Sequence, residues 1–186
     1  MTIVAVLGAS GLIGNAIATD LKARGMAVLA LARSFTAAQK AALDESAMET
    51  ALLSLDGAAL AALLAPADIL VNCIGVLQAA PGVDMEAVHR TFPDRLATIC
   101  ASGSKLLVHV SVPGEARGDR TDYARSKRNA EAALAASAAP HVILRPGFVI
   151  APAAFGGSAV IRALAMAPLR MPSVMGRAPF ASVAIS

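Results

Sequence analysis

The chain has 186 residues, 56% of them hydrophobic and 16% charged, which is enough for one buried core and excludes a disordered protein. The net charge of +3 comes from scattered basic residues, and only 3% of the chain is aromatic, so we expect no nucleic-acid partner. The most apolar stretch, residues 60–77, is interrupted by Pro66, Asp68 and Asn72, and the N-terminus has no secretory signal; we therefore expect no transmembrane segment and a cytoplasmic location.

The first element is an apolar strand over residues 2–7, which runs through a glycine-rich turn into a helix over residues 12–24. In such a turn Gly8 permits the tight bend, Gly11 lets the backbone approach a ligand, and Gly14 lets the helix pack closely on the strand. The helix N-terminus then presents free N–H groups to a diphosphate. The predicted pyrophosphate site consists of Gly8, Ser10, Gly11, Leu12, Ile13 and Gly14. The alternative is a glycine-rich turn that binds nothing.

Strand-like and helix-like segments then alternate along the chain. Strands are predicted over residues 27–32, 48–53, 69–74, 105–111 and 141–144, and helices from residue 36 and over 57–64, 84–101 (with Pro93 as a kink) and 121–137. This order predicts an α/β fold, a doubly wound parallel sheet of the Rossmann type with helices on both faces. We expect residues 1–150 to form a dinucleotide-binding domain. Residues 151–186, with a helix over 158–167 and a strand-like end over 179–186, then begin a truncated substrate-side segment.

Polar residues follow the ends of the second and third predicted strands. Arg33, with Ser34 beside it, stands where an acidic residue would select NAD, and a cation there favours the 2′-phosphate of NADP. An arginine that points into solvent is the alternative. Asp56 follows the third strand and either meets the adenine edge or caps the helix over 57–64. Both roles are compatible.

The fourth and fifth strands end at further candidate residues. Asn72 and Gly75 close the fourth strand beside the expected cofactor path, although Asn72 can equally bond neighbouring backbone. Tyr123, the only tyrosine, and Lys127 share one helix face, where a nearby ammonium is expected to lower the tyrosine pKa. Ser111, at the end of the fifth strand, is placed to hold a substrate oxygen.

Two alternatives concern this helix, and one further prediction concerns metals. Lys127 can instead pair with Glu131 at i+4, and Tyr123 can be an ordinary aromatic at a helix start. The two cysteines, Cys73 and Cys100, lack metal-type spacing, and the three histidines are isolated, so we expect buried free thiols and no metal.

These residues together resemble the short-chain dehydrogenase/reductase superfamily in its extended or atypical branch. The resemblance rests on the glycine triplet, Asn72-Cys73-Ile74-Gly75, Ser111 with Tyr123-x-x-x-Lys127, and Arg145-Pro146-Gly147. Residues 108–111, 123–127 and 144–148 resemble, more narrowly, NAD(P)H-binding proteins related to the NADH-ubiquinone oxidoreductase accessory subunit and to NmrA-like sensors. The resemblance implies that Cys73 and Pro146 lie in the cofactor site.

The resemblance also implies roles for the candidate residues. Tyr123 would exchange a proton with the substrate, Lys127 would bond the nicotinamide ribose and tune Tyr123, and Ser111 would polarise the reacting oxygen, with NADP (or NAD) as cofactor. The chain departs from the family in two places. The family's helix-4 asparagine is absent from residues 85–92, and the substrate-capping subdomain that relatives carry after the final strand is missing.

Two functions from different classes follow. The first is an NADP-dependent oxidoreductase or epimerase that acts on an alcohol, carbonyl or sugar-like small molecule. The second is a non-catalytic NAD(P)H-binding sensor or respiratory-complex accessory or assembly protein, and a scaffold with a vestigial site is a weaker third. Assembly as a homo-oligomer or with a membrane complex stays open, as does the identity of the substrate.

Overall fold

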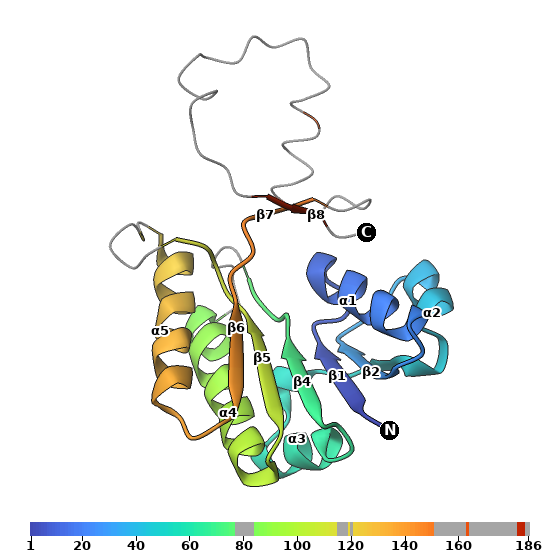
Figure 1. Ribbon diagram of the computed structural model, residues 1–186, viewed down its shortest axis with the longest axis horizontal. Coiled ribbons are helices and arrows are strands. Elements are labelled where there is room, and N and C mark those ends of the chain that lie inside the picture. The colour runs from blue at the N-terminus through green and yellow to red at the C-terminus, as the bar shows by residue number, and fades with distance from the viewer. Residues whose placement is uncertain (77–83, 115–118, 120, 151–162, 164–181, 185–186) are drawn as a thin grey trace.

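Six parallel strands form the main sheet, in the order β3-β2-β1-β4-β5-β6 (Figure 1). The structure, a computed structural model, describes residues 1–76, 84–114, 119, 121–150, 163 and 182–184. The six strands are β1 (Ile3–Leu7), β2 (Ala27–Ala32), β3 (Ala47–Glu49), β4 (Ile69–Asn72), β5 (Leu106–Val110) and β6 (His141–Leu144). Because the order reverses between β1 and β4, the carboxyl ends of these two strands open a crevice, as the doubly wound α/β prediction requires.

Helices cover both faces of this sheet. They are α1 (Leu12–Ala23), α2 (Ala37–Leu43), α3 (Gly57–Leu64), α4 (Phe92–Gly103) and α5 (Asp122–Ala136). On one face α1 and α2 pack through Ala18 and Leu43 on strand residues that include Val4 and Val6. On the other face α3, α4 and α5 bury mainly leucines, among them Leu60, Leu96 and Leu134. Figure 1 shows α4 and α5 beside β5 and β6, away from α1 and α2. The predicted fold class is therefore confirmed.

The sequence explains the ends of several helices. Gly25 adopts φ +76 and donates its N–H to Lys22 O at 2.9 Å, so it ends α1 in the conformation that glycine favours. Thr36 and Gln39 form a reciprocal capping box at the start of α2. Thr121 caps α5 by accepting the N–H of Ala124 at 3.1 Å.

Two predicted elements differ from the structure. The third strand ends at Glu49 and is followed by a 3-10 turn, η2 (Leu52–Ser54), so the prediction of a strand to residue 53 is wrong. An apolar run is compatible with a strand or with a buried turn. Here it forms a buried turn, because Leu52 is only 3% exposed. The helix predicted over 84–101 begins with a π-helical turn, η3 (Ala87–Thr91), before α4. Pro93 cannot donate to the carbonyl of residue 89 and clashes with it, which explains the wider turn.

Beyond β6 the structure describes a short second pairing. Strand β7 (Phe148–Ile150) pairs in parallel with β8 (Ser182–Ala184), within the strand-like end that the sequence predicted. The helix predicted over residues 158–167 lies outside the described residues, apart from residue 163. Among the described residues, no helix combines the length and the apolar character that crossing a membrane requires.

Candidate functional site

A cavity of about 500 Å³ lies at the carboxyl end of the sheet, where β1 and β4 diverge. Its lining comes from the glycine turn, the end of β2, the η2 region, the end of β4 and the start of η3. The residues are Gly8, Ser10, Gly11, Ala32, Arg33, Thr50, Ala51, Leu52, Leu53, Ser54, Cys73, Ile74, Gly75, Val76, Asp84, Ala87 and Val88. The position is the one at which open parallel sheets bind ligands.

Two glycines of the turn, Gly8 and Gly14, stand where a side chain would be strained or would clash. Gly8 has φ +84, and a Cβ on it would lie 3.1 Å from the Cys73 carbonyl carbon. A Cβ on Gly14 would lie 2.3 Å from Gly8 O, a distance that real structures do not tolerate. The roles predicted for Gly8 and Gly14, the tight turn and the close packing of helix on strand, are therefore confirmed.

The start of α1 offers main-chain donors without a competing cap. Gly11 is the N-cap residue and makes no side-chain cap, so the N–H groups of the first turn, which begins with Leu12 and Ile13, meet no capping oxygen. Gln39 Nε2 donates to Ser10 O at 2.9 Å and ties the turn to α2, a contact that the sequence did not reveal. A cradle of this shape fits the pyrophosphate of a dinucleotide, whose charge the N-terminus of α1 would stabilise.

Beside the end of β2, Arg33 lines the cavity wall, and both Arg33 and Ser34 are exposed. Asp56 is not among the lining residues: its Oδ1 accepts the Ala59 N–H at 2.8 Å and caps α3. The capping alternative for Asp56 is therefore observed, and the adenine role stays a prediction. In its place residues 50–54 form this wall. They were missed because the strand prediction continued through them.

The end of β4 forms the middle of the cavity. Asn72 is fully buried; its Nδ2 contacts His109 Nδ1 at 3.1 Å and its Oδ1 accepts the Ile74 N–H at 3.1 Å, which is the structural alternative that the sequence left open. Cys73 lines the cavity as a free thiol, and burial raises its pKa to about 12, so it is not a nucleophile at neutral pH. Cys100 is also free and is buried in the core, as expected.

Lys127 lies behind this wall, not in solvent. Its side chain is buried, and Nζ donates to Val110 O at 2.9 Å and to Ile74 O at 3.4 Å. Burial lowers the Lys127 pKa to about 8. A Cβ on Gly75 would lie 3.4 Å from Nζ, so Gly75 lies directly beside the ammonium. The alternative pairing of Lys127 with Glu131 is not observed.

Tyr123 is half-buried on α5, one turn before Lys127. Burial raises its pKa above the ordinary value, and the lowering that the sequence predicted from Lys127 is wrong for this structure. The reason is geometric, because the ammonium is directed to the carbonyls at the ends of β4 and β5. The Tyr123 ring instead meets the ring of His89, with centroids 5.4 Å apart and an angle of 71° between planes.

Ser111 is buried at the end of β5 and donates its hydroxyl to Glu131 Oε1. Glu131 also accepts from Arg128 Nη1 at 2.7 Å and from Arg145 Nη2 at 2.8 Å, and these bonds help to lower its pKa to about 2 despite burial. The single hydroxyl proton of Ser111 is therefore already donated to Glu131. In this arrangement Ser111 cannot donate to a substrate oxygen.

The predicted residues thus fall into two groups. Six of them line the cavity: Gly8, Ser10, Gly11, Arg33, Cys73 and Gly75. Lys127 stands directly behind Gly75. The other predicted residues are not among the lining residues: Leu12, Ile13, Gly14, Ser34, Asp56, Asn72, Ser111, Tyr123 and Pro146. The fully buried His89 was missed, since an isolated histidine gave no spacing signal. Within the described part of the chain, no group of three or more His, Cys, Asp or Glu side chains could hold a metal ion.

Comparison with protein families assigns the chain to a family. The family model described as NAD(P)H-binding matches residues 8–169, which span both the glycine turn and the α5 region. The chain belongs to the NAD(P)H-binding family. Comparison with curated protein sequences gives no match.

Several solved structures have a similar fold. Bordetella bronchiseptica WbmH, in complex with NAD+, is 19% identical with a TM-score of 0.69 over 89% of this chain and 63% of its own. B. bronchiseptica WbmG, in complex with NAD, is 18% identical with a TM-score of 0.67 over 83% and 56%. Helicobacter pylori ADP-L-glycero-D-manno-heptose-6-epimerase is 17% identical with a TM-score of 0.68 over 81% and 56%. The chain therefore spans 56% to 63% of the length of these proteins.

Proposed function

We propose that this NAD(P)H-binding protein takes NADP(H) and acts as an oxidoreductase or epimerase on an alcohol, carbonyl or sugar-like substrate. The observation that carries the proposal is the approach of Lys127 Nζ to the cavity wall at Gly75, one helical turn from Tyr123. The bound cofactor would supply or accept hydride. The side chains of α5 would supply the proton chemistry.

Each side chain has a defined task in this proposal. Tyr123 would give or take a proton at its hydroxyl, and Lys127, with two of its three donors on main-chain carbonyls, would direct the third toward the nicotinamide ribose. Ser111 completes the set only if its hydroxyl leaves Glu131. Residues 1–150 would be the dinucleotide-binding domain and residues 151–186 the start of a substrate-side segment.

The preference for NADP rests on Arg33. It lines the cavity directly after β2, and no hydrogen bond or ion pair to another described residue occupies its guanidinium. A guanidinium there matches the fork of a 2′-phosphate, whereas the ribose hydroxyl of NAD offers it no charge. Titration calorimetry should give NADPH a dissociation constant about 10- to 100-fold lower than that of NADH.

The Arg33→Ser variant should remove this preference and leave NADH binding unchanged. Arg24→Ser is the matched control, because Arg24 lies at the far end of α1, paired with Asp20. Equal affinities for both nucleotides in the unaltered protein would refute the assignment of NADP.

The test of catalysis is Tyr123→Phe, which removes one hydroxyl and keeps the ring against His89. NADPH oxidation is followed spectroscopically with a panel of aldehydes, ketones and nucleotide-sugars. We expect turnover in the unaltered protein and a loss of about 100-fold or more in the variant, with unchanged NADPH affinity. Undiminished turnover in the variant would contradict the proposal.

One observation favours a second candidate, a sensor or accessory protein that binds NAD(P)H without turnover. The hydroxyl of Ser111 donates to Glu131, which leaves the substrate side without the donor that carbonyl polarisation needs. This candidate includes assembly as a homo-oligomer or with a membrane complex. It predicts NADPH binding in calorimetry and no NADPH consumption across the same panel.

A further inference from the structure

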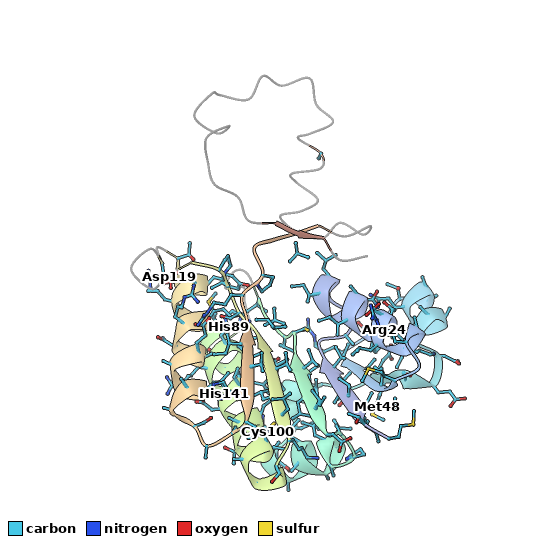
Figure 2. The ribbon with its side chains drawn as sticks, in the orientation of Figure 1. Arg24, Met48, His89, Cys100, Asp119 and His141 are labelled. Atoms are coloured by element: carbon cyan, nitrogen blue, oxygen red, sulfur yellow. The ribbon has the colours of Figure 1, made fainter. Side chains whose placement is uncertain are left out.

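His89 is a fully buried histidine with no role in the function proposed above. It lies in the π-helical turn η3, at the carboxyl-end half of the sheet and on the α5 side (Figure 2). His141 and Cys100 lie far from it, toward the opposite end of the sheet. Burial of an imidazole is costly unless both ring nitrogens find partners, so the partners show what the residue holds together.

The hydrogen bonds of His89 fix its tautomer. The main-chain N–H of Val76 can only donate, and it meets Nε2 at 3.0 Å, so Nε2 carries no proton. Nδ1 therefore carries the proton of the neutral ring and donates to Ser126 Oγ at 2.8 Å. Ser126 in turn donates its own hydroxyl to Tyr123 O at 2.9 Å. The bonds form one directed chain from Val76 to the first turn of α5.

The charges around His89 support the neutral ring. From α5 it faces Lys127 and Tyr123, and from β5 it faces His109. Burial, followed by the positive charge of Lys127, lowers the pKa of His89 to about 4. At neutral pH the acceptor at Nε2 is therefore present, and the bond to Val76 is kept.

The same ring lies beside Tyr123 and beside the Gly75 stretch of the cavity wall. Its edge packs on the ring of Tyr123, and a Cβ on Gly75 would lie 3.5 Å from Nε2 and 3.4 Å from Lys127 Nζ. Gly75 and Val76 line the cavity. His89 accepts a hydrogen bond from Val76, and Lys127 donates one to Ile74, so the two side chains fix one short stretch of the cavity wall.

We infer that His89 is a positioning residue, which sets the Tyr123 ring and the Gly75–Val76 wall in fixed relation to the cofactor. It contacts no reacting atom in this scheme and acts through Ser126 and Val76. The inference rests on the proposed function for its catalytic consequence. Its structural consequence, the placement of Tyr123, can be measured without turnover.

The composition of the chain allows the placement of Tyr123 to be measured without interference from other residues. Tyr123 is the only tyrosine and there is no tryptophan, so ultraviolet titration and tyrosine fluorescence both report this one ring. His89→Phe keeps a ring against Tyr123 and removes both hydrogen bonds, whereas His89→Gln places an amide oxygen within reach of Val76. His141→Phe is the matched control, because His141 lies at the start of β6 and bonds only Ala139 O among the described residues.

In the full chain, we expect His89→Phe to release η3 from α5, so that the Tyr123 ring gains mobility and its fluorescence anisotropy falls. Because water then reaches the hydroxyl, the raised titration midpoint of Tyr123 should move toward 10, its ordinary value. His89→Gln should restore much of the original midpoint, and His141→Phe should not change it. If His89→Phe fails to fold, Ser126→Ala, which removes the link to Tyr123 O, should lower the anisotropy in its place. An unaltered midpoint and anisotropy in folded His89→Phe would overturn the inference.

The rate of NADPH consumption provides a second test of the inference. If the unaltered protein consumes NADPH, His89→Phe should lower kcat about 10-fold while the KM for NADPH changes less, as expected of a misplaced proton donor. An unchanged kcat would overturn the inference. If the unaltered protein shows no turnover, the proposed function fails, and the tyrosine titration alone decides whether His89 positions the ring.

Discussion

The glycine turn and the α5 cluster (Ser111, Tyr123, Lys127 and Glu131) are built from different kinds of group. In the turn, main-chain atoms form the binding surface, and a side chain would fill the space: a Cβ on Gly14 would lie 2.3 Å from Gly8 O. In the α5 cluster, buried side chains make the contacts, and their partners come from distant elements, as with Ser111 and Glu131 or Lys127 and Ile74. The turn therefore follows from local sequence, whereas the cluster depends on tertiary packing.

The largest effect is expected from Gly14→Ala, which tests the turn. The new methyl group cannot coexist with Gly8 O, so α1 must move away from β1. We expect a loss of about 3 kcal/mol in the free energy of unfolding, with the melting temperature lower by about 6 to 12 °C. NADPH affinity should fall about 100-fold or more in titration calorimetry, because the first-turn amides move with the helix.

Gly57→Ala is the control for this change. Gly57 begins α3, and a Cβ on it would meet nothing within 4 Å, so stability and NADPH affinity should be retained or slightly improved. Retained NADPH affinity in Gly14→Ala would show that the turn is not the binding surface.

A smaller effect is expected from Glu131→Gln, which tests the α5 cluster. The variant leaves Arg128 and Arg145 without their shared carboxylate, although Arg145 is half exposed and water can reach it. We expect a loss of about 2 kcal/mol and a melting temperature lower by about 4 to 8 °C in calorimetric scans. Glu45→Gln, an exposed change, should cost nothing measurable. An unchanged melting temperature in Glu131→Gln would mean that the cluster contributes no stability.

The effect that is smallest near neutral pH is a loss of stability in acid, which two buried histidines cause and the glycine turn does not. Burial lowers the pKa of His89 to about 4 and of His109 to about 3, whereas both rings titrate near 6.5 in the unfolded chain. The unfolded state therefore takes up protons first as the pH falls. Stability is complete above pH 6.5 and decreases below it, by up to about 1.4 kcal/mol per pH unit for each ring, until the folded rings also titrate.

Urea unfolding at a series of pH values measures this slope. His89→Phe should give a shallower slope between pH 6.5 and about 4, because one of the two buried imidazoles is gone. A slope that does not change in this variant would contradict the buried neutral ring.

The sequence predicted the sheet, its helices and the glycine turn, because apolar runs and glycine spacing report local geometry directly. It failed where tertiary packing decides: the strand predicted to residue 53 ends at Glu49, and Tyr123 has a raised pKa where a lowered one was expected. His89 gave no signal, since its partners Val76 and Ser126 lie on other segments of the chain. For Ser111 the sequence predicted the position at the end of β5, but not that Glu131 accepts its proton.

The most direct test of the account is the response of main-chain amides to NADPH. In nuclear magnetic resonance spectra of the nitrogen-15-labelled protein, we predict that the largest and saturable shifts occur at the amides of Gly11, Leu12, Ile13 and Gly14, with a second set at Arg33. The account would be contradicted if NADPH bound tightly while these amides stayed unchanged and the shifts appeared elsewhere.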